Sequence, residues 1–263
     1  MTRLIHLTDL HFGLDRVALR PALIDRVNAA QADLIVIGGD LVHRARAAQF
    51  EAARALLDRL TAPWIAVPGN HDVPLFNLPA RVFAPFAAYR RTIARDLAPM
   101  RDVGPLRVIG INSTDPFAWQ RGKITPAEIA RVTDLIRARP EAIPVIALHH
   151  PLIQRPAITK ELAQGAPEAV AAFEAAGAQI VLSGHIHIWD TGGMLGEGRP
   201  MLHIQGGTGL CDRLSDVQNE FAILDLDGPD LRITREIAPM GAAGFGAPLV
   251  QRFSRAGGVW RVV

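Results

Sequence analysis

Short apolar runs alternate with longer segments of helical character along most of the chain, and this alternation most constrains the fold. Six runs have strand length, and they cover residues 3–9, 33–40, 63–70, 106–113, 142–150 and 178–185. Between most of them lie alanine- and arginine-rich segments that we predict to be helices, at 19–30, 46–60, 126–138 and 166–176. Strand–helix–strand alternation predicts an α/β protein whose mainly parallel sheet is covered by helices.

The pattern changes after residue 190. Glycine-rich turns separate short strand-like runs at 191–195, 200–207, 220–228 and 230–237, which predicts an antiparallel addition. The segment 73–104 carries prolines and aromatic residues among arginines, and we predict that it is a partly helical, lid-like excursion. We treat residues 1–238 as one domain, and the sequence offers no placement for the tail 239–263.

Composition excludes several classes of protein. Lys and Arg total 28 against 26 for Asp and Glu, so the net charge of +2 predicts no dedicated nucleic-acid surface. The single Cys211 excludes an intrachain disulfide, and we expect no thiolate metal site. No leader-like segment opens the chain, and no apolar run reaches the ~20 residues that cross a bilayer. We therefore expect a cytoplasmic protein without a membrane segment, and its oligomeric state stays open.

Polar side chains gather where five of the predicted strands end. Six of the nine histidines lie at these ends. The residues are Asp9 and His11, then Asp40, then Asn70, His71 and Asp72, then His149 and His150, and finally His185 and His187. Because the carboxyl ends of parallel strands line one crevice, we expect these side chains to lie close together.

The mixture of oxygen and nitrogen donors indicates a transition-metal site. Magnesium and calcium prefer shells made of oxygen, whereas zinc, manganese and iron accept imidazole. Seven candidate ligands are too many for one four-coordinate catalytic ion: Asp9, His11, Asp40, Asn70, His149, His185 and His187. Two metals ~3.5–4 Å apart that share a carboxylate would use such a set.

The five motifs, in the order DxH, GD, GNHD, HH and GHxH, resemble the calcineurin-like metallophosphoesterase family. Within that family the chain is most similar to bacterial class III cyclic-nucleotide phosphodiesterase-like proteins. The resemblance implies a four-layer αββα sandwich with a small lid or cap. It also implies a first metal held by Asp9, His11, Asp40 and His187, and a second held by Asp40, Asn70, His149 and His185, with Asp40 bridging. His71 matches the catalytic histidine, which contacts the phosphoryl oxygen or the leaving group.

The resemblance further implies that a small-molecule phosphodiester, such as a cyclic nucleotide, is hydrolysed by metal-bound hydroxide. A nucleotide-sugar or lipid-precursor pyrophosphatase, a nuclease and a phosphomonoesterase of the same fold remain alternatives. The ligand motifs contain no basic residue beyond histidine. This favours a monoanionic diester over a dianionic monoester, because phosphatases that bind dianions commonly place arginine or lysine beside the metals.

Four further residues receive supporting roles. Asp72 is interpreted either as an outer carboxylate that orients His71 or a ligand histidine, or as a plain cap. His150 is interpreted as a support for the ligands or a structural residue. His6 is expected to be a core histidine with satisfied hydrogen bonds, and Arg81 to lie on a solvated helix face.

Overall fold

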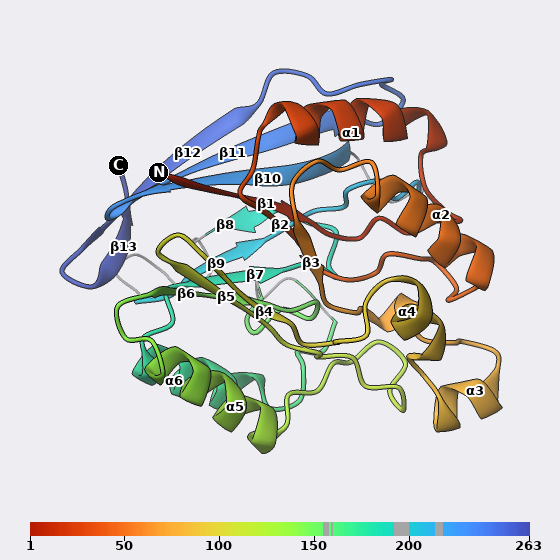
Figure 1. The fold of residues 1–263 in the computed structure, drawn as a ribbon, viewed down its shortest axis with the longest axis horizontal. Helices are drawn as coiled ribbons and strands as arrows, with labels where there is room; N and C mark the ends of the chain where they lie inside the picture. Colours follow the sequence, from red (N-terminus) through yellow and green to blue (C-terminus); the bar gives the residue numbers. More distant parts are fainter. Residues whose placement is uncertain (155–157, 159, 192–199, 214–217) are drawn as a thin grey trace.

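Two β-sheets packed face to face form the centre of the molecule, and helices cover their outer faces (Figure 1). The structure is a computed structural model that describes residues 1–154, 158, 160–191, 200–213 and 218–263. The first sheet has the strand order β13-β12-β11-β10-β1-β2-β3, and the second has β4-β5-β6-β7-β9-β8. The αββα sandwich that the resemblance implies is thus confirmed.

Each sheet contains one group of parallel strands, which lies at one end of the first sheet and in the middle of the second. The first sheet contains β1 (Thr2–Leu7), β2 (Leu34–Ile37), β3 (Trp64–Ala66), β10 (Gln218–Asp227), β11 (Asp230–Pro239), β12 (Leu249–Ala256) and β13 (Val259–Val262). The second contains β4 (Met100–Val103), β5 (Leu106–Gly110), β6 (Ile143–Ala147), β7 (Ile180–Ser183), β8 (Asp190–Thr191) and β9 (Leu202–Gln205). In the first sheet β1, β2 and β3 pair in parallel, and in the second β5, β6, β7 and β9 do so.

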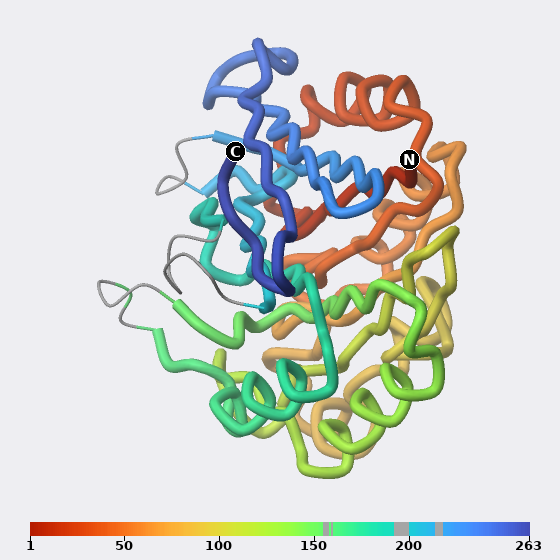
Figure 2. Tube along the Cα trace, turned by 90° about the vertical axis from the view of Figure 1, so that its left-hand side faces the viewer, coloured from red at the N-terminus to blue at the C-terminus, as the bar shows by residue number. Residues whose placement is uncertain are grey.

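Alternation of side chains along the strands builds the layers. In β1, Ile5 and Leu7 belong to a cluster with the outer helices α1 (Arg20–Ala29) and α2 (Ala47–Leu57). Leu4 belongs instead to the cluster between the two sheets. On the far side, β6 and β7 pack their outer faces against α5 (Pro126–Arg137) and α6 (Ala166–Ala176). Figure 2 shows α1 and this second pair of helices on opposite sides of the sandwich.

Each strand predicted up to residue 185 overlaps an observed strand, and each predicted helix contains an observed helix. The strands, however, do not share one sheet. The first three predicted strands lie in the first sheet and the next three in the second. Each run is apolar on both faces, so the pattern alone could not assign it to a sheet.

The late part of the chain divides between the two sheets. β10 and β11 pair antiparallel as predicted. β12 and β13, for which no placement was predicted, continue this antiparallel pairing and place most of the tail in the first sheet. β9 pairs antiparallel with β8, as predicted, but on its other side it pairs parallel with β7, which was not predicted. Most of the predicted run at 191–195 lies outside the described residues.

The segment 73–104 has an exposed part and a packed part. Helix α3 (Leu78–Phe83) has no buried residue and leaves Phe83 86% exposed. Helix α4 (Ala87–Thr92) packs the fully buried Tyr89 against Phe50 of α2, at 6.2 Å between ring centroids.

Arg81 does not lie on a solvated helix face, so that expectation was wrong. Its guanidinium donates to the carbonyl oxygens of Pro74, Pro116 and Ala118, at 2.9, 2.5 and 2.7 Å. Arg81 therefore ties α3 to the loop that precedes Trp119. The helix periodicity could not show this, because the partners are backbone groups distant in sequence.

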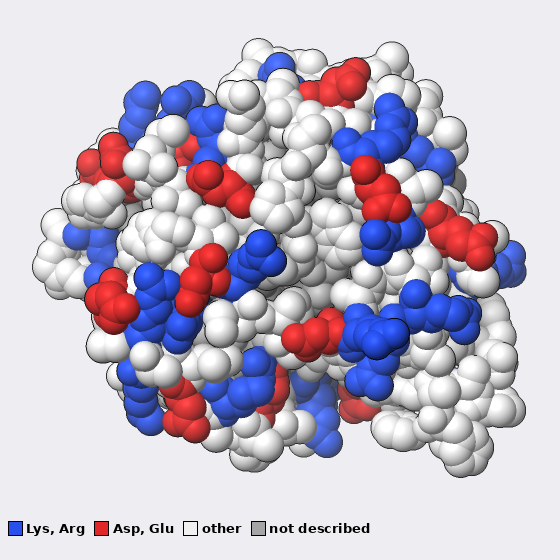
Figure 3. Space-filling model, viewed as in Figure 1, with Lys and Arg blue, Asp and Glu red and all other residues white. Residues whose placement is uncertain are grey.

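The surface carries mixed charges. On the face of Figure 3, acidic side chains are interspersed among the basic ones.

No helix in the described part of the chain is long and apolar enough to span a bilayer. Two 3₁₀ turns complete the elements, at Val17–Leu19 and Asn70–Asp72.

Candidate metal centre

Five strand ends from both sheets bring the predicted ligands together. The first sheet supplies residues after β1, β2 and β3, and the second supplies residues after β6 and β7. The former are Asp9, His11, Asp40 and Asn70, and the latter are His149, His185 and His187. Ligating atoms of Asp9, His11 and Asp40 lie within 4.8 Å of one another, and so do those of His149, His150 and His185.

Asp9 has one oxygen fixed by the protein and one facing imidazoles. Its Oδ2 accepts hydrogen bonds from the Thr8 hydroxyl at 2.6 Å and from the His185 N–H at 3.0 Å. Its Oδ1 has no hydrogen-bond donor among the described residues. That oxygen lies 3.2 Å from Nε2 of His187 and 3.6 Å from Nε2 of His11. Asp9 therefore presents one lone-pair-bearing oxygen to two ring nitrogens.

Asp40 repeats this arrangement between two histidines. Its Oδ1 accepts a hydrogen bond from the His71 N–H at 2.8 Å. Its Oδ2 lies 3.3 Å from Nε2 of His149 and 3.6 Å from Nε2 of His11. Burial alone would raise the pKa of both carboxyls, but the nearby imidazoles hold the pKa of Asp9 and of Asp40 well below the usual range. Both groups are therefore carboxylates at neutral pH.

The surroundings of His149 favour a positive charge between its Nε2 atom and the oxygens of Asp40 and Asn70. Its Nδ1–H donates to the Gly38 carbonyl at 2.8 Å, which leaves Nε2 directed at Asp40 Oδ2 and, at 3.3 Å, at Asn70 Oδ1. Burial opposes a charge on the ring, yet the Asp40 carboxylate overrides it and raises the pKa of His149 to about 9. A neutral ring would aim a lone pair at two oxygen acceptors. A metal cation among these three atoms satisfies all of them, so the residues fit a metal.

His11 and His185 provide neutral ring nitrogens. Nε2 of His11 and Nε2 of His187 lie 3.1 Å apart beside Asp9. Burial lowers the pKa of His11 to about 4 and that of His185 well below its usual range. Uncharged imidazoles keep a lone pair for a metal, so both of these rings fit metal binding.

Five of the seven candidate ligands lie in the left-handed backbone region. Their φ angles run from 50° to 74°, at Asp9 (55°), His11 (50°), Asp40 (50°), His185 (74°) and His187 (61°). L-residues rarely adopt this conformation, and it is concentrated at functional sites. The pairs Asp9/His11 and His185/His187 therefore lie in tightly turned backbone rather than in an extended strand.

The glycines of the motifs are needed mainly for close approach. A Cβ at Gly69 would overlap Asp40, and a Cβ at Gly184 would overlap the Thr8 hydroxyl and Asp9. Neither glycine has a positive φ, whereas Gly39 has a φ of 91°. The missing side chain of Gly184 therefore makes room for the Asp9 carboxylate.

Asp72 and His150 hold the loops around the centre. The Asp72 carboxylate accepts hydrogen bonds from the Gly69 and Val42 N–H groups at 2.8 and 3.1 Å, and so joins two of the motif loops. Burial and the Asp40 charge raise the pKa of Asp72 to about 7. His150 pairs with the Ser113 hydroxyl at 2.9 Å and with the Gln120 carbonyl at 3.1 Å.

One other expectation for a single residue was wrong: His6 is buried, but neither ring nitrogen has a hydrogen-bond partner among the described residues. Cys211 was given no place in the site by the sequence, yet its sulfur lies within 4.8 Å of ring nitrogens of His11 and His187. The sequence spacing gave no indication that the chain returns to the site there.

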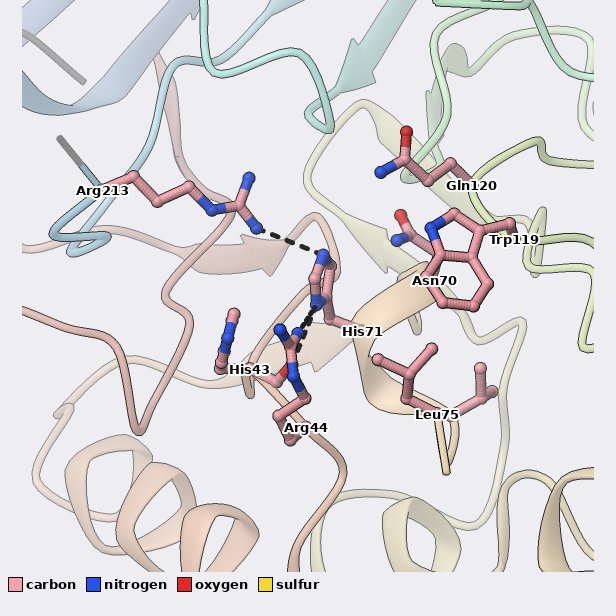
Figure 4. A pocket seen from close by; sticks show the side chains of 9 residues that line it. His43, Arg44, Asn70, His71, Leu75, Trp119, Gln120 and Arg213 are labelled. Atoms are coloured by element: carbon pink, nitrogen blue, oxygen red, sulfur yellow. Dashed lines mark hydrogen bonds between the residues drawn. The ribbon is translucent and has the colours of Figure 1, made fainter. Parts of the chain in front are cut away.

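His71 lies at the edge of this cluster between two arginines (Figure 4). Its Nδ1 lies 2.9 Å from the His43 carbonyl, and its Nε2 lies 3.2 Å from a guanidinium nitrogen of Arg213. A guanidinium nitrogen of Arg44 lies 3.4 Å from Nδ1. The ligand motifs themselves contain no arginine, but two arginines from outside them lie beside His71. Arg44 follows Asp40 by four residues, but Arg213 gave no sequence signal.

Residues 2–189 match the family model described as calcineurin-like phosphoesterase. The chain belongs to the calcineurin-like phosphoesterase family. A probable cyclic nucleotide phosphodiesterase of Vesicomyosocius okutanii is 25% identical over 158 residues, which cover 57% of this chain and 62% of the relative. The glycerophosphodiester phosphodiesterase GpdQ of Enterobacter lignolyticus is 34% identical over 82 residues, which cover 26% of this chain and 29% of the relative. The chain thus matches less than two thirds of either relative.

Solved structures of this fold support the same architecture. Purple acid phosphatase PPD1 from yellow lupin superposes with a TM-score of 0.67 at 12% identity, over 95% of this chain and 53% of that protein. Vacuolar protein sorting 29 from Cryptosporidium parvum gives a TM-score of 0.52 at 12% identity, over 96% and 98%. Because both identities are only 12%, these superpositions show a shared fold and nothing more.

Proposed function

We propose that this protein is a dinuclear metal-dependent phosphodiesterase. The observation that carries the proposal is the position of Asp40 Oδ2, which lies 3.6 Å from Nε2 of His11 and 3.3 Å from Nε2 of His149. This oxygen can serve as a ligand to two ions at once. The family membership and the phosphodiesterase names of both relatives support the same reaction class.

The chain's own residues divide into two ligand sets around Asp40. Asp9, His11 and His187 would complete the first, and Asn70, His149 and His185 the second. Manganese, iron and zinc suit this mixed donor set. When bound, the ions supply positive charge that neutralises the phosphoryl group and lowers the pKa of an attacking water.

His71 and the arginines act on the substrate side. The His43 carbonyl fixes the orientation of the His71 ring, so that its Nε2 edge points to Arg213. From there His71 contacts a phosphoryl oxygen or the departing oxygen, and can move a proton at Nε2. The two guanidiniums, from Arg44 and Arg213, place positive charge beside the His71 ring.

Cyclic nucleotides are our leading substrate, because the first relative carries that name. A phosphomonoesterase is the second candidate, and Arg44 and Arg213 favour it. A monoester is largely dianionic at neutral pH, and these arginines supply the additional cations that a dianion needs.

Metal analysis and a hydrolysis screen test the proposal. Protein reconstituted with manganese, iron or zinc should hold two ions per chain and hydrolyse bis-p-nitrophenyl phosphate or cyclic nucleotides. Asp40→Ala should lose both ions, whereas His11→Ala should weaken mainly one. A firm limit of one ion per chain contradicts the dinuclear centre. A higher kcat/KM for p-nitrophenyl phosphate than for the diester makes the protein a phosphomonoesterase instead.

A further inference from the structure

Two cavities open beside the candidate centre and share one wall. Trp119 and Gln120 line both of them. The first, of about 270 Å³, also touches Asn70 and His71, and the second, of about 380 Å³, also touches His185. Each cavity thus reaches a different part of the ligand cluster. A phosphodiester at the centre has two substituents, and each would have a cavity of its own.

The first cavity holds two arginines that have no counter-ion among the described residues. Arg44 and Arg213 contact His71, and Arg44 also donates to the His43 carbonyl at 3.0 Å, but neither guanidinium contacts a carboxylate. Several other partly buried arginines are paired with carboxylates, as in Arg3–Asp225, Arg20–Asp15, Arg26–Glu236 and Arg235–Glu220. Arg16 and Arg81 are not, but their guanidiniums donate to carbonyl oxygens of the protein. The first cavity differs because two guanidiniums without a carboxylate meet at one histidine.

Positive charge in the first cavity is concentrated to an unfavourable degree. Burial and then the charges of Arg213 and Arg46 lower the pKa of Arg44. An anion held between the two guanidiniums would relieve this repulsion, and the planar fork of arginine matches carboxylate and phosphate oxygens. The second cavity also has two cations, Arg121 and Lys160, but there Arg121 lies 3.8 Å from the Glu161 carboxylate and the Lys160 amino group donates to the His185 carbonyl at 2.9 Å.

Resting on the proposed phosphodiesterase function, we propose that Arg44 and Arg213 form a subsite for a second anionic group of the substrate. The preferred substrate is then a phosphodiester whose substituent on the His71 side carries a carboxylate or a phosphate, and this replaces cyclic nucleotides, which carry a single phosphate, as the leading substrate. Trp119, which is 68% exposed, and Leu75 form an apolar wall of this cavity. The atoms that link the central phosphate to the second anion pack along this wall. The second cavity takes the uncharged substituent.

Binding of two matched phosphonates to the metal-loaded protein tests the subsite. Methyl 3-carboxybenzylphosphonate and methyl 3-carbamoylbenzylphosphonate differ only in a carboxylate and a carboxamide, and neither has a cleavable bond at the benzyl side. Calorimetry should show about tenfold tighter binding of the carboxylate, as expected for a charge-assisted contact. In Arg44→Gln and in Arg213→Gln the ratio should fall to about threefold or less. A third ligand with a phosphonate in place of the carboxylate tells which anion the subsite prefers.

Arg46→Gln is the matched control, because it removes the same charge from an exposed residue two positions from Arg44. Its affinity ratio should stay at the wild-type value, and melting curves check that all three variants fold. Equal affinity for the two ligands in the wild type, or no binding of either, overturns the subsite. So does an equal loss for both ligands in the arginine variants, which would assign the arginines to the central phosphoryl group. Hydrolysis of bis-p-nitrophenyl phosphate by the wild type tests the proposed function separately.

Discussion

His71 contacts Arg213 and Arg44 and has no role in our proposed ligand sets, so its removal separates chemistry from metal binding. We expect His71→Ala to keep both metals and to lose ~10²–10⁴ in kcat if the ring protonates the departing oxygen. Elemental analysis and steady-state kinetics on the same preparation check this.

The leaving group distinguishes the two possible roles of His71. The loss should shrink for p-nitrophenolate, which departs without protonation, and should remain large for an alkyl alcohol. Equal losses for good and poor leaving groups would show that His71 stabilises phosphoryl charge instead.

The left-handed backbone at His185, with a φ of 74°, predicts an unusual order of stabilities. With metal removed by a chelator, His185→Gly should be more stable than His185→Ala by about 1 kcal/mol, because glycine adopts this conformation without a steric cost. Urea unfolding of both variants measures the difference. In helix α6 the order should reverse, with Ala172→Gly less stable than the wild type. A His185→Ala variant that matches or exceeds the glycine variant contradicts the strain argument.

At the scale of elements, Arg81 joins helix α3 to the loop that leads to the shared cavity wall. We expect Arg81→Ala to release this loop, since three backbone carbonyls lose their donor. KM should rise about threefold to tenfold through the loss of substrate positioning, while the metal content stays unchanged. Kinetics with a diester substrate measure this. Arg90→Ala, at an exposed position of α4, is the control and should leave KM unaltered.

The elements show why some parts of the site could be predicted and others could not. The strand runs and the motifs after them follow from local composition, so Asp9, Asp40 and His149 could be found by their positions at strand ends. Assignment to two sheets depends on pairing partners, and runs that are apolar on both faces do not specify these. Arg213 and Cys211 reach the centre through a late connection, so no spacing between neighbouring residues indicates their place.

At the scale of the whole molecule, Trp260 links the last strand to the opposite sheet. It is 5% exposed, lies in the cluster between the sheets, and donates its indole N–H to the Gln179 carbonyl just before β7 at 2.9 Å. Trp260→Ala should lower the free energy of unfolding by about 3–5 kcal/mol, because it leaves a large cavity and a lost hydrogen bond. Chemical denaturation measures this cost. Val262→Ala, at a 62% exposed side chain of the same strand, should change it by less than about 0.5 kcal/mol.

The left-handed backbone at five candidate ligands has an evolutionary consequence. Each such L-residue costs roughly 1–2 kcal/mol, and together the five approach the net stability of a typical domain, about 5–15 kcal/mol. Selection for stability alone would therefore favour glycine at these positions, and only selection for ligand chemistry opposes that drift. In a lineage that no longer needs the reaction, we expect Asp9, His11, Asp40, His185 and His187 to be replaced by glycine or asparagine before the neighbouring core residues change.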